Sequence, residues 1–203
     1  NNPAVAYLNR KGYYSINVQA ICDSEMIFTN INARYPGATD DAAIWQTSTV
    51  NANLQTRYLA GERNTWLIGD SGYPIQPWMM TPIPDAPGDT PEGIYTERHK
   101  SARNVIERAF GNLKQRFKCT KKTRVLYYEH GMAGKIIYSC VVLHNICRRF
   151  NVPDVDEINS DDEDSDTDSD DNNEESPLVD IDQLTEGRFV RRQLINTIAN
   201  NNA

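Results

Sequence analysis

Apolar and polar residues alternate from Tyr14 to Cys22, which is the period-two pattern of a strand with two unlike faces. A turn at Asp23–Glu25 separates this stretch from a second β-like run, Met26–Ala33, so the pair predicts a hairpin. The segment Tyr35-Pro36-Gly37 is expected to break the second run. Thr39–Asp41 then offers helix N-cap chemistry ahead of an apolar stretch at 42–45.

A short apolar run, Trp66–Ile68, predicts a buried strand that ends abruptly at Gly69-Asp70-Ser71-Gly72. Residues 74–91 contain six of the ten prolines and predict a loop or extended segment. Helical periodicity follows at about 99–117 and 131–150, and a weaker amphipathic pattern at 181–198 predicts a short C-terminal helix. This order is typical of an α/β domain with a mixed sheet flanked by helices. We therefore expect a domain over residues 1–150, an acidic linker over 151–180 and a helix within 181–203.

Charge divides the 203-residue chain into unlike parts, although the formal net charge is only −7. Residues 150–187 contain 16 acidic residues and no Lys or Arg, whereas residues 98–124 contain ten Lys or Arg and one acid, Glu107. The basic block predicts a polyanionic partner, most simply nucleic acid. The run Asp154–Glu175 has too few apolar residues to fold and is expected to be a disordered segment, either a solvated linker or a screen for the basic block.

Several classes of protein are excluded or disfavoured by the sequence. No apolar run approaches the ~18 residues of a membrane span, so no membrane association is expected. The first residues, Asn1-Asn2-Pro3, resemble an internal cut rather than a signal peptide. Four cysteines without a CxxC pair favour a reducing, intracellular compartment. The sequence also lacks the phosphate-binding GxxxxGK[ST] and GxGxxG motifs and the GxSxG motif of acyl-transfer hydrolases.

Two acids are the strongest candidates for chemistry. Asp70 follows a strand between two glycines, where a ligand could approach the backbone; an Asx turn is the structural alternative. Glu107 shares one helix face with Arg103 and Lys114, and a carboxylate among cations suits a metal-dependent phosphodiesterase. The alternative for Glu107 is an i,i+4 ion pair with Arg103. Oxygen ligands favour Mg²⁺, and Asp41 is an accessory candidate that helix capping would also explain.

Zinc is the alternative metal. Cys140, His144 and Cys147 lie at i, i+4 and i+7 of one predicted helix, with Cys119 near in sequence. Structural zinc sites usually take ligands from turns with CxxC spacing, so core packing is the simpler interpretation of this face. His144 and Asn145 are then expected to bind backbone or loop partners.

Ordered blocks of sequence between residues 7 and 150 resemble the DDE superfamily endonucleases of the PIF/Harbinger transposases, especially the domesticated, transposase-derived nucleases of animals. The blocks are Asn9-Arg10-Lys11-Gly12, Tyr35-Pro36-Gly37 with Asp41, Leu67–Tyr73, Trp78–Pro82, Arg103 with Ile106–Gly111 and Leu113–Lys114, Arg116-Phe117, and Val142–Ile146. The spacing Arg103-x3-Glu107-x6-Lys114 also resembles an Arg-Glu-Lys signature of related bacterial transposases. The Tyr that begins that signature would fall at Lys100 and is missing.

The resemblance implies an RNase H-like fold and a DNA-cleaving Asp-Asp-Glu triad that holds Mg²⁺ or Mn²⁺. Asp70 matches the second Asp and Glu107 the Glu, and the first Asp is expected on a strand before Tyr7–Arg10, upstream of this sequence. DNA contacts are expected from five cations: Arg103, Arg108, Lys114, Arg116 and Lys118. The family also implies a nuclear location, with the cytoplasm as an alternative, and a Myb-like DNA-binding partner. The competing function is a domesticated, non-catalytic DNA-binding or protein-interaction module.

Overall fold

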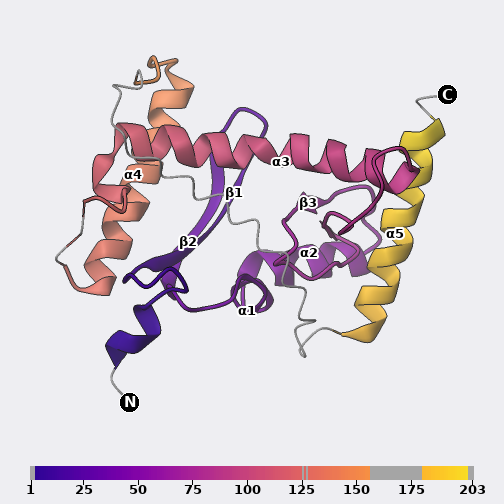
Figure 1. Ribbon diagram of the computed structural model, residues 1–203, viewed down its shortest axis with the longest axis horizontal. Helices are drawn as coiled ribbons and strands as arrows, with labels where there is room; N and C mark the ends of the chain where they lie inside the picture. The colour runs from indigo at the N-terminus through magenta and orange to yellow at the C-terminus, as the bar shows by residue number, and fades with distance from the viewer. Residues whose placement is uncertain (1–2, 125, 127, 156–179, 201–203) are drawn as a thin grey trace. The chain divides into compact units, whose positions relative to one another are not determined.

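The computed structural model describes residues 3–124, 126, 128–155 and 180–200 (Figure 1). Most of the acidic linker, residues 156–179, lies outside the described residues, so its predicted disorder stays a prediction. The chain divides into two compact units. Among the described residues, the first unit comprises the chain up to Thr39 together with Asn104–Val155, and the second comprises Asp40–Arg103 together with residues 180–200. Each unit is described by itself below.

The first unit is built on an antiparallel hairpin of β1 (Ile16–Cys22) and β2 (Phe28–Pro36), preceded by the 3₁₀ helix η1 (Pro3–Tyr7). The predicted hairpin is therefore present, and β2 ends at Pro36, within the break expected at Tyr35-Pro36-Gly37. Asn17 pairs with Tyr35 and Ile16 with Pro36, so pairing continues up to the proline. Proline is tolerated because it stands at the last position of the strand, where a missing N–H costs little.

The turn of the hairpin is held by Asp23. Its Oδ1 accepts hydrogen bonds from the N–H groups of Glu25, at 2.9 Å, and Ile27, at 3.0 Å. Met26 adopts the left-handed conformation, with φ at 63°, and its side chain is buried. Asp23 therefore acts as a turn residue, the role in which the short polar side chain competes best for backbone N–H groups.

Two helices pack on this hairpin: α4 (His130–Arg149) and the C-terminal part of α3 (Pro91–Arg116), which spans both units. The short 3₁₀ helix η2 (Lys118–Thr120) follows α3. The shared core consists of large apolar side chains from both strand and helix, namely Met26, Phe28, Ala109, Leu113 and Val141. Burial of such side chains from water is the main force that holds the helices to the strands.

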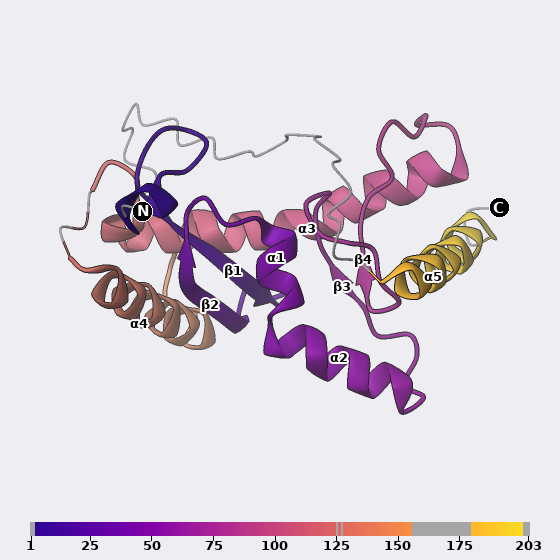
Figure 2. The same ribbon diagram turned by 90° about the horizontal axis from the view of Figure 1, so that it is seen from below.

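Polar contacts fix α4 against β2, and Figure 2 shows α4 running alongside that strand. The amide of Asn145 both accepts from the Phe28 N–H and donates to the Phe28 carbonyl, each at 2.8 Å. The His144 Nε2 lies 2.9 Å from the Met26 carbonyl oxygen. A Cβ atom at Gly134 would lie 2.7 Å from the Ala33 carbonyl oxygen, so this crossing of helix and strand requires glycine. The expectation that His144 and Asn145 bind backbone partners is confirmed.

The second unit combines α1 (Asp41–Gln46), α2 (Thr49–Leu59), β3 (Leu67–Ile68), β4 (Met79–Met80), the N-terminal part of α3, and α5 (Ile181–Asn200). The strands β3 and β4 pair in parallel. The predicted strand at 66–68 is present, but it is not fully buried, because Ile68 is 47% exposed. The proline-rich stretch contains β4 as well as loop.

Helix α2 and the early start of α3 were not expected from the sequence. Ser48 caps α2 by accepting a hydrogen bond from the Asn51 N–H at 3.1 Å. The Thr90 hydroxyl accepts from the Gly93 N–H at 3.1 Å, so Pro91 opens α3 at the helix position where proline is favoured. Ser48 and Thr90 are common N-cap residues, and their signals were present in the sequence.

The C-terminal helix α5 docks on β4 and the loop around it, and Figure 2 shows it beside that strand. A Cβ atom at Gly187 would lie 2.8–2.9 Å from backbone atoms of Gln76, so the two backbones are in close contact. The Gln76 side chain donates to Gln183 at 2.8 Å and accepts from the Trp45 indole N–H at 2.6 Å. The α/β class is thus confirmed, with two two-stranded sheets among the described residues.

Candidate functional site

Asp70 stands directly after β3, on a turn that its own carboxylate stabilises. Its Oδ1 accepts a hydrogen bond from the Gly72 N–H at 3.0 Å, which is an Asx turn. Gly69 precedes it at a tightly packed point, because a Cβ atom there would lie 2.9 Å from the Met79 sulfur and 3.1 Å from the Tyr73 ring. The Asx turn considered as the alternative role of Asp70 is therefore present. The carboxylate that forms it is half-buried at the end of a strand.

The other oxygen of Asp70 is held by Arg103. The distance from Arg103 Nη2 to Asp70 Oδ2 is 3.0 Å, and the two side chains are 29% and 31% exposed. The structure thus gives Arg103 an ion pair with Asp70. A charge-assisted hydrogen bond at this degree of burial orients the carboxylate and limits its rotation.

Arg103 is the third member of a row on α3 with four-residue spacing. Tyr95 donates its hydroxyl to the Thr81 carbonyl at 3.0 Å, and the His99 Nε2 lies 3.1 Å from the Met80 carbonyl oxygen. The row therefore binds α3 to β4 and to the loop of Asp70. Helix geometry explains it, because residues four positions apart lie on the same face. The sequence showed this spacing, but nothing in it indicated which strand the row would contact.

Burial perturbs two members of this row. Tyr95 is 2% exposed, and burial raises the pKa of its hydroxyl to about 12. Burial also lowers the pKa of His99, and the neighbouring Arg103 and Arg191 guanidinium groups lower it further. Since the Met80 carbonyl can only accept, His99 carries its proton on Nε2. The His99 Nδ1 is buried and has no hydrogen-bond partner among the described residues.

Asp41 lies close to Asp70. A Cβ atom added at Gly72 would be 3.1 Å from Asp70 Oδ1 and 3.7 Å from Asp41 Oδ2, so the two oxygens are no farther apart than the sum of these distances. Asp41 is the first residue of α1, and Asp40 takes the cap position without a side-chain cap hydrogen bond. The accessory acid predicted from the sequence therefore lies close to Asp70, the residue that Arg103 also contacts.

The other predicted site residues belong to the first unit. Glu107 and Arg108 are exposed on α3, Lys114 is half-buried, and Lys118 is exposed at the start of η2. Arg116 differs from these, because its side chain is only 17% exposed and binds the Pro153 carbonyl oxygen and Asp154. The structure thus brings together Asp41, Asp70 and Arg103, while the pairing of Asp70 with Glu107 stays a prediction.

The carboxylates of Asp70 and the nearby Asp41 suit a hard divalent ion. Asp70 and Asp41 supply carboxylate oxygens, which Mg²⁺ prefers and which it binds one or two at a time while retaining waters. Within the described part of the chain, no group of three His, Cys, Asp or Glu residues could hold a metal by itself. Two carboxylates match the one or two that a magnesium site uses.

The residues considered for zinc are used differently. The His144 ring is occupied by the Met26 carbonyl, and the Cys140 Sγ lies 3.8 Å from the Cys119 Sγ. Burial raises the pKa of Cys140 to about 11. These residues are part of the first unit's packing.

Comparison with known proteins identifies the family of this chain. The family model described as DDE superfamily endonuclease matches residues 1–145, and the chain belongs to that family. "Putative nuclease HARBI1" of Homo sapiens is 35% identical over 150 residues, covering 72% of this chain and 41% of the relative. The protein of the same name in Xenopus laevis is 28% identical over 160 residues, covering 77% of this chain and 44% of the relative.

A plant protein is also similar to this chain. "Protein ALP1-like" of Arabidopsis thaliana is 27% identical over 161 residues, covering 72% of this chain and 39% of the relative. The chain thus spans about two fifths of the length of these relatives. No solved structure matches the chain. None of the helices described here is long and apolar enough to cross a membrane.

Proposed function

We propose that this chain is part of a metal-dependent DNA endonuclease derived from a Harbinger-type transposase. The observation that carries the proposal is the Asp70 carboxylate, held by Arg103 at 3.0 Å with Asp41 beside it, in a chain of the DDE endonuclease family. The proposal includes an RNase H-like arrangement, in which Asp70 is the second acid of the triad and Glu107 the third. Its cofactor is Mg²⁺ or Mn²⁺, its substrate is DNA, and its location is nuclear.

Each residue has a distinct task in this proposal. Asp70 and Glu107 hold the divalent ion, which when bound polarises a phosphoryl oxygen and lowers the pKa of an attacking water. Arg103 fixes the Asp70 carboxylate in one orientation. Arg108, Lys114 and Lys118 attract the phosphate backbone, so binding weakens steeply with salt. Arg116 also lies in the basic block, but its contacts with Pro153 and Asp154 make it chiefly a structural residue.

Sequence-specific recognition is assigned in this proposal to a separate, Myb-like DNA-binding protein. The cations of the basic block contact phosphates, which position a protein on DNA but carry no sequence information. The competing proposal, a non-catalytic DNA-binding module, is favoured by one observation: the described residues hold no complete three-ligand cluster. The two proposals differ in whether Asp70 binds a metal ion.

The deciding experiment measures Mn²⁺ binding to the chain by electron paramagnetic resonance, before any activity is assayed. Asp70→Asn and Glu107→Gln keep side-chain shape and remove the charge that a hard ion requires; each should weaken Mn²⁺ binding about tenfold or more. Asp89→Asn is the matched control, because Asp89 is an exposed acid in the loop before α3. It should leave Mn²⁺ affinity unchanged.

DNA cleavage then separates the two proposals. Metal-dependent nicking of supercoiled DNA by the full-length protein, which would include the first Asp expected upstream, supports the nuclease if it is lost in both site variants. Mn²⁺ affinity that is the same in wild type, Asp70→Asn and Glu107→Gln contradicts it. DNA binding that persists with no Mn²⁺ effect favours the non-catalytic module.

A further inference from the structure

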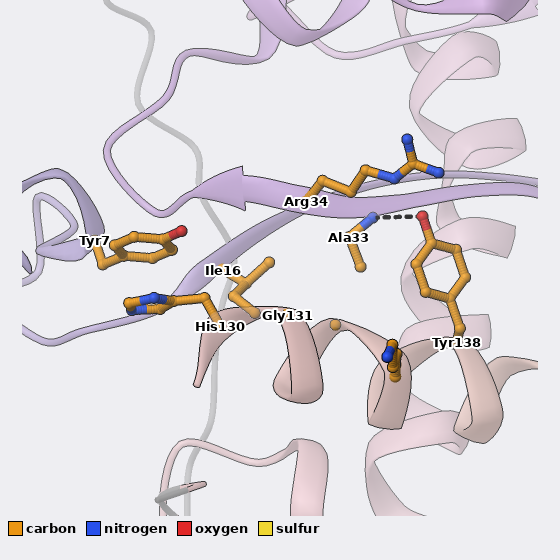
Figure 3. A pocket seen from close by; sticks show the side chains of 9 residues that line it. Tyr7, Ile16, Ala33, Arg34, His130, Gly131 and Tyr138 are labelled. Atoms are coloured by element: carbon orange, nitrogen blue, oxygen red, sulfur yellow. Dashed lines mark hydrogen bonds between the residues drawn. The ribbon is translucent and has the colours of Figure 1, made fainter. Parts of the chain in front are cut away.

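The first unit contains a cavity that the proposed nuclease chemistry does not use. It has a volume of about 370 Å³ and lies between η1, the strands and the start of α4 (Figure 3). A volume of this size is within the range of small-molecule sites, which begins at about 300 Å³. The lining residues come from four separate elements, which makes the cavity a feature of the folded unit rather than of one loop.

Aromatic rings form both ends of the cavity. The rings of Tyr7 and His130 are stacked, with centroids 3.4 Å apart and planes inclined by 9°. Tyr138 stands at the opposite end, where its hydroxyl oxygen accepts a hydrogen bond from the Ala33 N–H at 3.3 Å. Figure 3 shows Ile16 and Ala33 between the two ends. Flat rings with an apolar wall between them suit a planar, aromatic ligand.

The lining is basic. Arg34 and Lys135 are both exposed members of the cavity wall, and no lining residue is a carboxylate. The segments that contribute to the lining are also poor in acidic residues. Residues 3–22 contain no acid, and residues 108–135 contain one, Glu129. A ligand that carries negative charge beside its ring is therefore favoured over a neutral aromatic one.

The first unit also contains an aromatic–cation contact outside the cavity lining. The Lys122 Nζ lies 4.5 Å from the centre of the Tyr13 ring, and Tyr14 is 66% exposed. Tyrosines interleaved with lysines are what a single strand of nucleic acid uses, since its bases stack on aromatic rings while its phosphates follow the cations. Duplex DNA keeps its bases stacked inside and offers no free ring to a cavity.

From these observations we infer that the cavity binds one unpaired base of a single-stranded DNA segment. The base lies between the Tyr7–His130 stack and Tyr138, and the flanking phosphates contact Lys135 and Arg34. This site requires neither a metal ion nor the Asp70 and Glu107 carboxylates. It is therefore independent of the proposed nuclease centre and can stand or fall separately.

Gly131 offers a way to fill the cavity without disturbing the fold. It lines the cavity in the first turn of α4, and a Cβ atom added there meets no atom within 4 Å. Gly131→Ala should therefore be accommodated, whereas the larger side chain of Gly131→Leu should occupy the space that a base needs. Gly134 cannot serve this purpose, because its Cβ would meet the Ala33 carbonyl oxygen at 2.7 Å.

The experiment measures binding of a fluorescein-labelled dT₁₂ oligonucleotide by anisotropy, with EDTA present so that no metal site contributes. Gly131→Leu should weaken binding about tenfold, the order expected for losing one stacked base, and Gly131→Ala should bind as wild type does. His130 is exposed, and His130→Ala removes one of the two stacked rings. This variant should also weaken binding. Circular dichroism confirms that each variant is folded.

Crosslinking locates the site. An oligonucleotide with one 5-iododeoxyuridine, irradiated on the wild-type chain, should crosslink to the peptide that contains Tyr7 or His130. Equal affinity of Gly131→Leu and Gly131→Ala would overturn the inference, as would crosslinks found only elsewhere. A Gly131→Leu substitution that weakens binding of a blunt duplex as much as binding of dT₁₂ would overturn it too, because the cavity accepts only an unpaired base.

Discussion

The contact between α5 and Gln76 allows a quantitative test of whether the C-terminal helix is part of the second unit. Replacing Gly187 by alanine would place a methyl group 2.8–2.9 Å from the Gln76 backbone, where a carbon contact needs well over 3 Å. Overpacking of this kind costs about 1–3 kcal/mol, and alanine recovers up to about 1 kcal/mol through its higher helix propensity. Any outward shift of α5 also lengthens the 3.2 Å hydrogen bonds from Arg191 to the Thr81 and Pro82 carbonyls.

Those hydrogen bonds are worth about 1.5–3 kcal/mol each when a charged donor is involved, so a partial loss adds to the steric cost. The expected net effect of Gly187→Ala is a decrease in the free energy of unfolding of about 1–3 kcal/mol. The matched control is Gly111→Ala in α3, where the added Cβ meets nothing within 4 Å and only the helix-propensity gain of about 1 kcal/mol applies.

The two variants should thus change stability in opposite directions. Urea unfolding followed by circular dichroism measures the difference, and amide hydrogen exchange reports on α5 directly. We expect faster exchange in α5 for Gly187→Ala and no change there for Gly111→Ala. Equal stability of the two variants, together with unchanged exchange in α5, would refute the close contact between Gly187 and Gln76.

Two further predictions concern polar contacts in the cores. Asn145→Ala leaves the Phe28 N–H and carbonyl without their side-chain partners and should lower the free energy of unfolding by about 2–4 kcal/mol; a loss below 0.5 kcal/mol in urea unfolding would contradict the bridge. Burial lowers the pKa of both His99 and His144 below the unfolded value of 6.5, so an unfolded chain binds more protons than the folded one in acid. Their contribution to stability is complete above pH 6.5 and is lost as pH falls through the lowered pKa values. The melting temperature should drop between pH 7 and pH 5, by less in His99→Asn, and a drop identical in that variant would count against the role of His99.

Local patterns predicted the elements whose contacts lie near in sequence. The alternation of apolar and polar residues located the hairpin, because a strand pair with a short turn needs only local information. The turn at Asp23 and the turn at Asp70 were also identified, since each carboxylate accepts a hydrogen bond from a backbone N–H two residues later. The position of Asp70 after a short strand was therefore predictable from the sequence.

Tertiary contacts decided what local patterns could not. Helix α2 has few strongly apolar residues, and it is held by Val50, Leu54 and Tyr58 packing on a cluster around Trp78, which only the folded unit shows. The close approach of α5 to Gln76 depends equally on a partner far away in the chain. The division of α3 between two units was not predictable either, because its helical periodicity is continuous.

Not every cation counted in the basic block, residues 98–124, is available to bind a polyanion. Arg116 is one of the five cations expected to contact DNA, but Asp154 lies 3.8 Å from Arg116 and 3.7 Å from Arg148. The Asn112 amide also donates to Asp154 at 3.1 Å. The first acid of the C-terminal run therefore pairs with two arginines of the folded unit, and a polyanion would have to displace it. In the proposed function, the exposed Arg108 and Lys118 are consequently the better candidates for DNA contacts, and Arg116→Ala should lower stability more than it lowers DNA affinity.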